Sequence, residues 1–407
     1  MDWHSLLSAR RFGQSSGQKS FSGEVRTEFQ RDYDRIIFSS PFRRLQNKTQ
    51  VFPLPGSVFV HNRLTHSLEV ASVGRSLGNM VFDRITPYLD KHEQEIVREI
   101  DAVIGTACLA HDLGNPPFGH SGEKAISHYF SQGKGKEIQG ELSELEYADL
   151  KNFEGNANLI RLLTNQFKGR RKGGYVLTFA SLGAMIKYPY DSSHAETTKK
   201  FGFFQSEAGT FQQIVNTLEI PVEDTSSGKY VRHPLVYLVE AADDICYQIM
   251  DIEDACKLNI LSFEKVYQTY MAFFSESTDK NQIAKIEATL KEVTDRNEQI
   301  AFLRAMTINK LVSAVASVFY EHYHDIMQGT FDSKLLKQTS PYIQNAYKQA
   351  SAIAFGEIYR HPSVVKIEIS GYNVLGFLLD EFFQAIMHSG SDYSQKILSL
   401  MPAQFHP

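Results

Sequence analysis

The sequence predicts an all-α protein, with a helical core followed by a helical C-terminal extension. Apolar residues recur at three- and four-residue spacing through most of the chain, which is the pattern of amphipathic helices. Alternation of apolar and polar residues, which indicates strands, is rare and short. No stretch has the length and composition of a linker. We therefore expect a core over residues 1–275 and a helical region over 276–407, packed together as one continuous unit.

The first two predicted helices each place a histidine on an apolar stripe. Residues 64–82 carry the first stripe, formed by His66, Val70, Val73 and Leu77. Residues 96–112 carry the second, formed by Ile100, Val103, Ile104, Ala107, Cys108 and His111. The same spacing predicts further helices over 234–258, 300–325, 341–360 and 372–388. Residues 275–300 are polar and charged at helical spacing, which indicates an exposed helix.

Three shorter stretches depart from this pattern. Gly174–Thr178 is the best candidate for a strand among the rare, short runs with period-two alternation. Residues 131–141 are rich in Gly, Lys and Gln, and residues 168–174 form a basic run that contains glycine. Both of these stretches are expected to be loops.

The composition favours a cytoplasmic protein without a membrane segment. The first residues lack the unbroken apolar stretch of a signal peptide, and no window approaches the roughly 18 uninterrupted apolar residues of a membrane span. The three cysteines form no C-x-x-C pair, which argues for a reducing compartment. Cys108 and Cys246 fall in apolar helical runs and are expected to be small core residues.

The net charge of −5 gives no general attraction for nucleic acid. A polyanion would have to be bound by local basic clusters, of which the candidates are Arg43-Arg44, Lys168–Lys172 and Lys199-Lys200. For Lys168–Lys172 a solvated loop is the favoured interpretation, because most charge runs are solvated.

The most informative motif is His111-Asp112, within the run Leu109–Glu123. The dipeptide alone proves little, since His324-Asp325 repeats it. The first copy differs because His66 lies upstream and Asp243 lies downstream, both on the apolar side of predicted helices, whereas Asp244 is turned about a quarter of the way round. Buried ionisable groups are costly unless they are paired or bound to a metal. The four side chains therefore favour a metal site, although a hydrogen-bonded core histidine is the better interpretation of either histidine alone.

Two imidazole nitrogens and two carboxylate oxygens suit one borderline or hard divalent cation, such as Mn, Fe, Co, Ni or Zn. Softer metals would be expected to have thiolate ligands. Four protein ligands leave positions for water and a phosphate oxygen, as a hydrolytic metal requires.

A second motif follows the first. Gly114–Gly119 breaks the helix after Asp112 and delivers His120, with Glu123 three residues later. An i, i+3 pair faces the same way on a helix, so Glu123 can fix the tautomer of His120. In a phosphoester site, His120 would then be a candidate general acid for the leaving oxygen. The alternative is a histidine that merely caps the start of a helix.

Taken together, the motifs resemble those of the HD-superfamily deoxynucleoside triphosphate triphosphohydrolases, the bacterial dGTPase-like family. The matching blocks occur in order across most of the chain: Pro41–Pro53, His61–Val70, Leu109–Glu123, Asn152–Ala157, Leu177–Ala184 with Lys187–Pro189, Lys200–Phe204, Arg232–Tyr247 and Ile369–Leu375. The match is specific for the family and less so for the base of the substrate.

The resemblance implies an HD-domain helical fold and one divalent metal, with Mn or Mg favoured, held by His66, His111, Asp112 and Asp243. It also implies hydrolysis of dGTP or several deoxynucleoside triphosphates at the α-phosphate, giving a deoxynucleoside and tripolyphosphate. His120 and Glu123 would form the acid dyad.

The resemblance also implies a set of substrate contacts. Gln46 and Asp251 would contact the sugar 3′-hydroxyl, and Tyr247 would pack under the deoxyribose and exclude a 2′-hydroxyl. The phosphates would be met by Arg63, Lys187 and Tyr188. The two tyrosines could instead be core aromatics, and the two cations could be surface side chains with buried stems.

The resemblance also suggests possible partners. By analogy with the family, we expect a homo-oligomer, either a hexamer or a tetramer. An effector dNTP or single-stranded DNA is the sharper alternative for the Lys168–Lys172 run.

Two other functions stay open at this point. One is an HD phosphohydrolase that acts on a monophosphate or a cyclic dinucleotide. The other is a non-catalytic nucleotide or single-stranded DNA sensor, which the presence of every expected ligand argues against.

Overall fold

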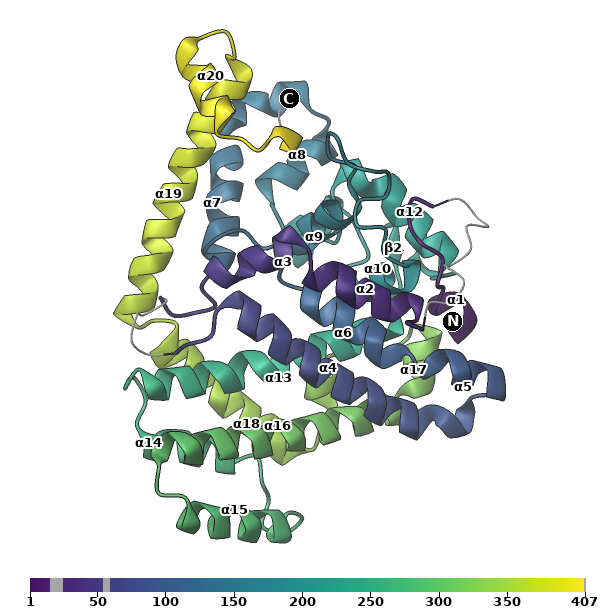
Figure 1. Cartoon of the computed structure of the whole chain (residues 1–407), viewed down its shortest axis with the longest axis vertical. Coiled ribbons are helices and arrows are strands. Elements are labelled where there is room, and N and C mark those ends of the chain that lie inside the picture. Colours follow the sequence, from purple (N-terminus) through teal and green to yellow (C-terminus); the bar gives the residue numbers. More distant parts are fainter. Residues whose placement is uncertain (15–24, 54–58, 406–407) are drawn as a thin grey trace.

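The computed structural model describes residues 1–14, 25–53 and 59–405 and confirms the all-α prediction (Figure 1). Within these ranges the only strands are β1 (Val222–Asp224) and β2 (Lys229–Tyr230), which pair antiparallel with Val222 opposite Tyr230. This small hairpin is exposed or half-buried, so the hydrophobic core is built by helices alone.

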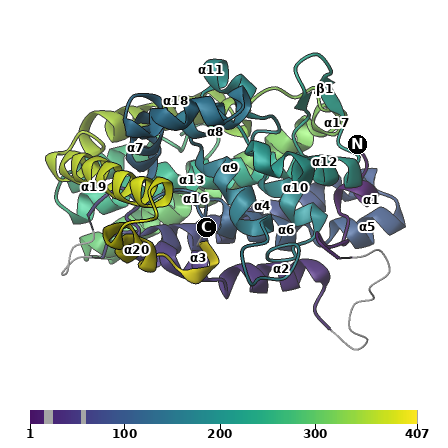
Figure 2. The same cartoon turned by 90° about the horizontal axis from the view of Figure 1, so that it is seen from above.

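The centre of the fold is the packing of α4 (Arg63–Ile85) against α6 (Ile100–Ala110). Around this pair lie α2 (Glu28–Ile37), α10 (Phe179–Met185), α13 (Pro234–Lys257) and α16 (Arg296–Glu321) (Figures 1 and 2). Gly74 allows the close approach of α4 and α6, because a Cβ there would lie 2.5 Å from the Cys108 sulfur. As predicted, Cys108 and Cys246 are buried core residues.

Local signals in the sequence set the starts of the helices that carry the site. The Asn62 side chain accepts a hydrogen bond from the Thr65 backbone N–H at 2.9 Å and caps α4. Pro234 occupies the first turn of α13, where its missing N–H costs nothing. Before α7 (Gly119–Ser131), Phe118 and Gly119 adopt left-handed conformations with φ of 66° and 54°, which turn the chain sharply.

The remaining helices complete the N-terminal and middle parts of the chain. These are α1 (Trp3–Leu6), α3 (Ser40–Arg44), η1 (Leu45–Asn47), η2 (Thr86–Tyr88), α5 (Lys91–Val97), η3 (Lys134–Glu141), α8 (Glu144–Lys151), α9 (Gly155–Thr164), η4 (Ser192–His194), α11 (Ala195–Thr198), η5 (Gln205–Glu207) and α12 (Ala208–Thr217). The helix predicted over 96–112 is interrupted, because α5 ends at Val97 and α6 begins at Ile100. His111 and Asp112 therefore lie just past the C-terminal end of α6.

The C-terminal third contains α14 (Phe263–Met271), α15 (Lys280–Glu292), α16, α17 (Tyr323–Gln328), η6 (Leu335–Gln338), α18 (Pro341–Ile353), the π-turn η7 (Ala354–Ile358), α19 (Pro362–Met387), α20 (Asp392–Ser399) and η8 (Ala403–Phe405). As predicted for 275–300, α15 is largely exposed and buries only Ile286. Helices α14, α16 and α18 lie beside α13 and α4, whereas α19 runs along the upper left edge of Figure 1, next to α7 (Figures 1 and 2).

By length and composition, α16 is the one helix in the described ranges that could cross a membrane. One face of this helix is instead buried, including Leu303, Leu311, Val315 and Phe319, and it packs on α4 and α13. It therefore serves as a core helix in this fold.

Two of the local predictions were wrong. Gly174–Thr178 does not form a strand, because Gly174 and Val176 have φ of 59° and 55°; the segment makes only an isolated bridge between Thr178 and Arg11. Residues 131–141 are not simply a loop, since Lys134–Glu141 forms the 3₁₀ helix η3. Residues 168–174 have no regular structure, as predicted.

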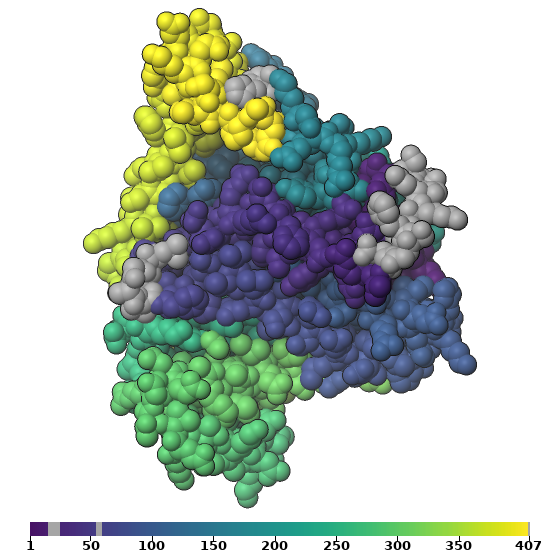
Figure 3. Space-filling view, viewed as in Figure 1, coloured from purple at the N-terminus to yellow at the C-terminus, as the bar shows by residue number. Residues whose placement is uncertain are grey.

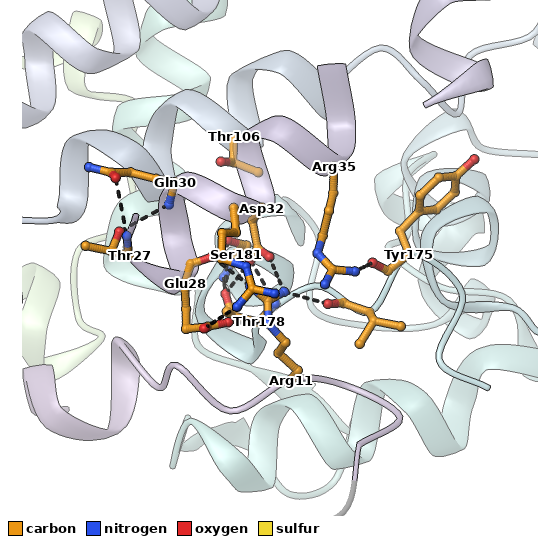
Figure 4. Close-up of polar contacts among 12 residues, drawn as sticks. Arg11, Thr27, Glu28, Gln30, Asp32, Arg35, Thr106, Tyr175, Thr178 and Ser181 are labelled. Carbon is orange, nitrogen blue, oxygen red and sulfur yellow. Dashed lines mark hydrogen bonds and ion pairs between the residues drawn. The ribbon is translucent and has the colours of Figure 1, made fainter. Parts of the chain in front are cut away.

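The segment near Thr178 is held by a buried polar cluster that also anchors the N-terminus (Figure 4). The Arg11 guanidinium donates to the Asp32 carboxylate at 2.6 Å and pairs with Glu28. The second Asp32 oxygen accepts hydrogen bonds from the backbone N–H and the hydroxyl of Thr178, at 2.8 and 2.7 Å. Arg35 donates to the Tyr175 carbonyl at 2.9 Å. This cluster joins three segments that are distant in sequence.

Candidate metal centre and active site

Four side chains from three helical segments converge at the centre of the fold. His66 lies on α4, His111 and Asp112 follow α6, and Asp243 lies on α13. The Asp243 Oδ1 atom is 3.2 Å from His66 Nε2 and 3.5 Å from His111 Nε2. One ligand atom from each of His66, His111 and Asp112 also lies within 4.8 Å of the others. The structure therefore brings together all four residues predicted as metal ligands.

The chemistry of these donors fits a divalent cation. The Nδ1 atom of His111 is 2.6 Å from the Cys108 carbonyl oxygen, so Nδ1 carries the proton and donates it there. The Nε2 atom of the same ring is buried and has no hydrogen-bond partner, which leaves its lone pair facing the cluster. A buried acceptor without a partner is costly unless a cation or another donor satisfies it.

The two carboxylates are held in the ionised state that metal binding needs. Burial opposes ionisation of Asp243, but the nearby His111 and His66 lower its pKa below the ordinary value. Burial likewise opposes ionisation of Asp112, and the Arg63 guanidinium and His111 lower its pKa. By contrast, burial raises the pKa of the Cys108 thiol, so this neighbour stays protonated.

The neighbouring candidates lie outside the cluster. The Asp244 carboxylate points away and forms an ion pair with the Lys334 ammonium at 2.9 Å. In the second His-Asp copy, the His324 ring packs on Tyr88 at 5.3 Å between ring centroids, and the Asp325 side chain is exposed. The structure therefore favours Asp243 over Asp244, as the helix-face argument predicted.

The cluster lies in the wall of a cavity of about 500 Å³, within the roughly 300–1,000 Å³ typical of small-molecule sites. The cavity wall carries the cations Arg63, Lys124, Lys187 and Lys200 and the side chains of His120 and Tyr188. It also includes the apolar residues Val51, Phe355, Val364 and Ile367 together with Glu368. The lining therefore offers partners both for an anion and for an apolar or aromatic group.

His120 and Glu123 form the predicted pair at the start of α7. The Nδ1 atom of His120 is 2.8 Å from Glu123 Oε2, and the His120 side chain is 77% exposed. The other Glu123 oxygen accepts a hydrogen bond from the Gly155 backbone N–H at 2.9 Å. Burial raises the pKa of Glu123, but the His120 hydrogen bond and the Lys200 charge outweigh it and lower the pKa. An ionised Glu123 can hold His120 as a proton donor that faces the cavity.

The predicted phosphate contacts line the same cavity. Arg63 donates from Nη1 to Asp112 Oδ2 at 2.6 Å, and its buried Nε has no partner. The Lys187 ammonium lies 3.2 Å from Glu240 and 5.8 Å from the centroid of the Tyr188 ring. Burial lowers the pKa of Lys187, but Glu240 outweighs it and raises the pKa, so this cation remains charged. Lys200, which the sequence indicated only as part of the basic pair Lys199-Lys200, pairs with Glu154 at 2.7 Å.

Tyr247 and Tyr359 pack together next to Asp251, one of the predicted sugar contacts. Tyr247 lines the cavity, and its ring centroid lies 5.8 Å from that of Tyr359, which the sequence argument missed. The Tyr359 hydroxyl donates to Asp251 Oδ2 at 2.7 Å. Burial raises the pKa of Asp251 to about 8, so this carboxyl is protonated near neutral pH. Asp251 lies behind the tyrosines rather than in the cavity wall.

Gln46, like Asp251, is a predicted contact that the structure does not bring to the cavity wall. It lies in η1, where its side chain is exposed, and its carbonyl oxygen accepts a hydrogen bond from the Asn62 side chain. Gln50, four residues later in the same motif, lines the cavity instead, and its buried Oε1 has no hydrogen-bond partner. The motif indicated the right segment, but only the turn made by η1 determines which glutamine faces inward.

Comparison with known proteins identifies the class of protein to which this chain belongs. Residues 63–197 match the HD domain family model, in agreement with the paired histidines on α4 and after α6. This fold and site are those of an HD-domain hydrolase.

Relatives over nearly the whole chain define the family. A deoxyguanosinetriphosphate triphosphohydrolase-like protein of Synechocystis sp. is 39% identical, over 98% of this chain and 90% of the relative. One of Pseudomonas aeruginosa (strain LESB58) is 37% identical over the same shares of each chain. A deoxyguanosinetriphosphate triphosphohydrolase of Serratia proteamaculans is 31% identical, over 93% and 82%. The chain belongs to this family of deoxyguanosinetriphosphate triphosphohydrolase-like proteins.

Proposed function

We propose that this protein hydrolyses deoxynucleoside triphosphates at the α-phosphate, releasing a deoxynucleoside and inorganic tripolyphosphate. The observation that carries the proposal is that one cavity holds the four-ligand cluster, the His120–Glu123 pair and a set of cations. The names of the relatives point to dGTP as one substrate.

In this proposal, His66, His111, Asp112 and Asp243 hold one divalent cation, with Mn or Mg favoured. Such a cation supplies Lewis acidity to a phosphoryl oxygen and makes water a better nucleophile at neutral pH. The chain contributes the ionised carboxylates and the oriented His111 ring described above.

His120 acts as the general acid. Its Nδ1–H is held by Glu123, which leaves the Nε2–H of the protonated ring free to face the cavity. Transfer of that proton to the 5′-oxygen neutralises the leaving group as the bond to phosphorus breaks. Glu123 stays ionised and stabilises the charged imidazole throughout.

The cavity cations bind the triphosphate. Arg63, Lys187 and Lys200 face the space next to the metal ligands and offset the charge that would repel an incoming nucleophile. Tyr188 lines the same space.

The tyrosine pair accounts for a preference for deoxyribose. Tyr247 packs under the sugar, and its ring leaves no room for a 2′-hydroxyl on that side. Asp251 acts through its hydrogen bond with Tyr359 and holds this ring against Tyr247. Gln50, with its free amide oxygen, replaces Gln46 as the candidate for a sugar hydroxyl.

The proposal extends to location and partners. We place the protein in the cytoplasm as a homo-oligomer, a tetramer or a hexamer. The exposed Lys168–Lys172 run is a candidate site for an effector dNTP or single-stranded DNA, and its Arg170 side chain donates to Gln404 at 3.1 Å. If neutral substitutions at Arg170 and Arg171 leave activity and the response to these ligands unchanged, the run is only a solvated loop.

A panel of dNTPs and NTPs, each with several divalent metals, tests the function by chromatography of the products. Tripolyphosphate together with a deoxynucleoside supports the proposal. Orthophosphate or pyrophosphate as the product, or turnover of only monophosphates or cyclic dinucleotides, contradicts it. The absence of any turnover would favour a non-catalytic sensor.

The His120→Ala variant tests the proton donor. It should keep metal and nucleotide binding, which are measured by calorimetry, and lose turnover by about 10²-fold or more. Turnover close to that of the unmodified protein would remove His120 from the mechanism.

A further inference from the structure

Helix α19 is unusual because it is long and apolar but mostly uncovered. Of its 26 residues, only Val364, Gly371 and Ala385 are buried. It lies along an outer edge of the molecule, where the space-filling view shows it as part of a ridge (Figures 1 and 3). An apolar surface of this kind usually marks a contact with another macromolecule.

The inner face of α19 packs on α7 and reaches the active-site cavity. Gly371 lies so close to Phe118 that a Cβ there would fall 2.2 Å from the ring. Phe383 contacts the rings of Tyr129 and Phe130, and Lys134 pairs with Asp380 at 2.6 Å. The N-terminal part of the same helix supplies Val364, Ile367 and Glu368 to the cavity wall.

The outer side of α19 is free of charge in its middle. Ile369, Val374, Phe377 and Leu378 are exposed, with Phe377 at 63% and Ile369 at 58%. Between Glu368 and Asp380 the sequence has no charged residue. Covering these large apolar side chains would remove them from water, which favours association.

A charge of opposite sign stands at each end of this stretch. Lys366 precedes it and Glu381 follows it, 15 residues later and about 22 Å along the helix. At 100° per residue, these two positions lie within about 60° of each other around the helix axis, so both are on the outer side. Lys366 is exposed, and Glu381 accepts only a hydrogen bond from the Tyr393 hydroxyl at 2.7 Å.

The charged and apolar residues on the outer side of α19 match those of a second copy of α19 that runs in the opposite direction. The midpoint between Lys366 and Glu381 falls between Asn373 and Val374. In an antiparallel pair centred there, Lys366 meets Glu381 of the partner subunit on both sides of the axis. By the same register, Phe377 meets the small Ser370 of the partner subunit near the centre of the contact.

We propose that the outer face of α19 pairs antiparallel with α19 of a second copy of this chain, about a two-fold axis near Asn373. A two-fold contact buries the same patch on both subunits and is compatible with a dimer, a tetramer or a hexamer. Because the inner face of α19 forms one wall of the cavity, pairing of the outer face would also hold that wall in position. The proposal does not depend on the substrate, since its test measures mass and cross-linking.

The first test is the mass of the full-length protein in solution, measured by light scattering, for the unmodified chain and for Phe377→Glu. The substitution places a carboxylate in the centre of the apolar face and should lower the mass by a factor of two or more. Phe38→Glu is the matched control, because Phe38 is 70% exposed on a different surface, and it should keep the unmodified mass. A Phe377→Glu variant that is folded by circular dichroism and has the unmodified mass overturns the proposal.

Charge exchange tests the register. Lys366→Glu alone places carboxylates opposite each other and should weaken assembly, whereas the double variant Lys366→Glu/Glu381→Lys should restore it. A single variant that assembles as tightly as the unmodified chain contradicts the pairing.

Cross-linking tests the orientation. Under mild oxidation, Asn373→Cys should form a covalent dimer, because this position lies next to the axis, and Lys366→Cys should not. A covalent dimer through position 366 would indicate a parallel pair and overturn the proposal.

Discussion

Arg63 and Asp112 form a buried ion pair in which Nη1 lies 2.6 Å from Oδ2. The pair joins the start of α4 to the end of α6. The other Asp112 oxygen accepts from the Asn115 side chain at 2.5 Å, so the carboxylate is oriented from both sides. Hydrogen bonds that orient a metal-ligating side chain in this way are worth about 10–100-fold in metal affinity.

Arg63→Ala should therefore weaken metal binding by about 10–100-fold, apart from any loss of phosphate contact. Titration calorimetry with Mn²⁺ and no nucleotide measures this directly. Arg75→Ala is the control, because Arg75 lies on the same helix and is mostly exposed. An unchanged Mn²⁺ affinity in Arg63→Ala would mean that Asp112 needs no support from α4.

Gly371→Ala should slow turnover by about 10-fold or more while metal affinity stays the same. The added Cβ would meet the Phe118 ring at 2.2 Å and displace the turn that delivers His120. Gly376→Ala, on the same helix, has nothing within 4 Å of the added Cβ and should leave kcat unchanged. The measurement is kcat for both variants, and equal values would show that the turn absorbs the displacement.

His61→Gln should destabilise the protein in a pH-dependent way. The His61 ring lies between Asp254 and Glu69, at 2.9 and 3.1 Å. Burial lowers the pKa of His61, but its hydrogen bonds to the two carboxylates raise it from 6.5 to about 10. A raised pKa stabilises the folded state fully below 6.5, and the benefit is lost as the pH rises towards 10.

The difference in unfolding free energy between the unmodified chain and His61→Gln should thus be largest below pH 6.5 and shrink up to about pH 10. Chemical unfolding at several pH values gives this curve. His92→Gln is the control, since His92 is exposed. A difference that does not vary with pH would show that His61 is neutral in the folded protein.

Arg11→Met should cost about 3–5 kcal/mol of folding free energy, because it leaves Asp32 buried without its cation. Arg10→Met removes an adjacent but exposed arginine and should change stability by less than about 0.5 kcal/mol. Urea unfolding distinguishes the two. Equal midpoints would mean that the Thr178 hydrogen bonds alone satisfy Asp32.

The helices and the cluster of candidate metal ligands could be predicted from the sequence, because both depend on the periodic spacing of apolar residues. His66, His111 and Asp243 share faces with buried apolar residues, so their direction follows from the spacing of Val70, Ile104 and Val239. The convergence of the three helical segments required the order of the motifs and the family resemblance in addition.

The residues that the sequence argument missed depend on turns and on long-range packing. Gln50 rather than Gln46 lines the cavity, because Gln46 lies within the turn η1 with its side chain exposed. Tyr359 reaches the cavity from beyond a π-turn, more than 100 residues after Tyr247. Left-handed residues at Gly174 and Val176 prevented the predicted strand, and no periodicity reveals such dihedral angles.

The position of α19 in the chain has a consequence for biosynthesis. The proposed metal ligands occur by residue 243, whereas the wall formed by Val364, Ile367 and Glu368 is translated more than 100 residues later. The cavity is therefore complete only after α19 has been synthesised and has packed on α7.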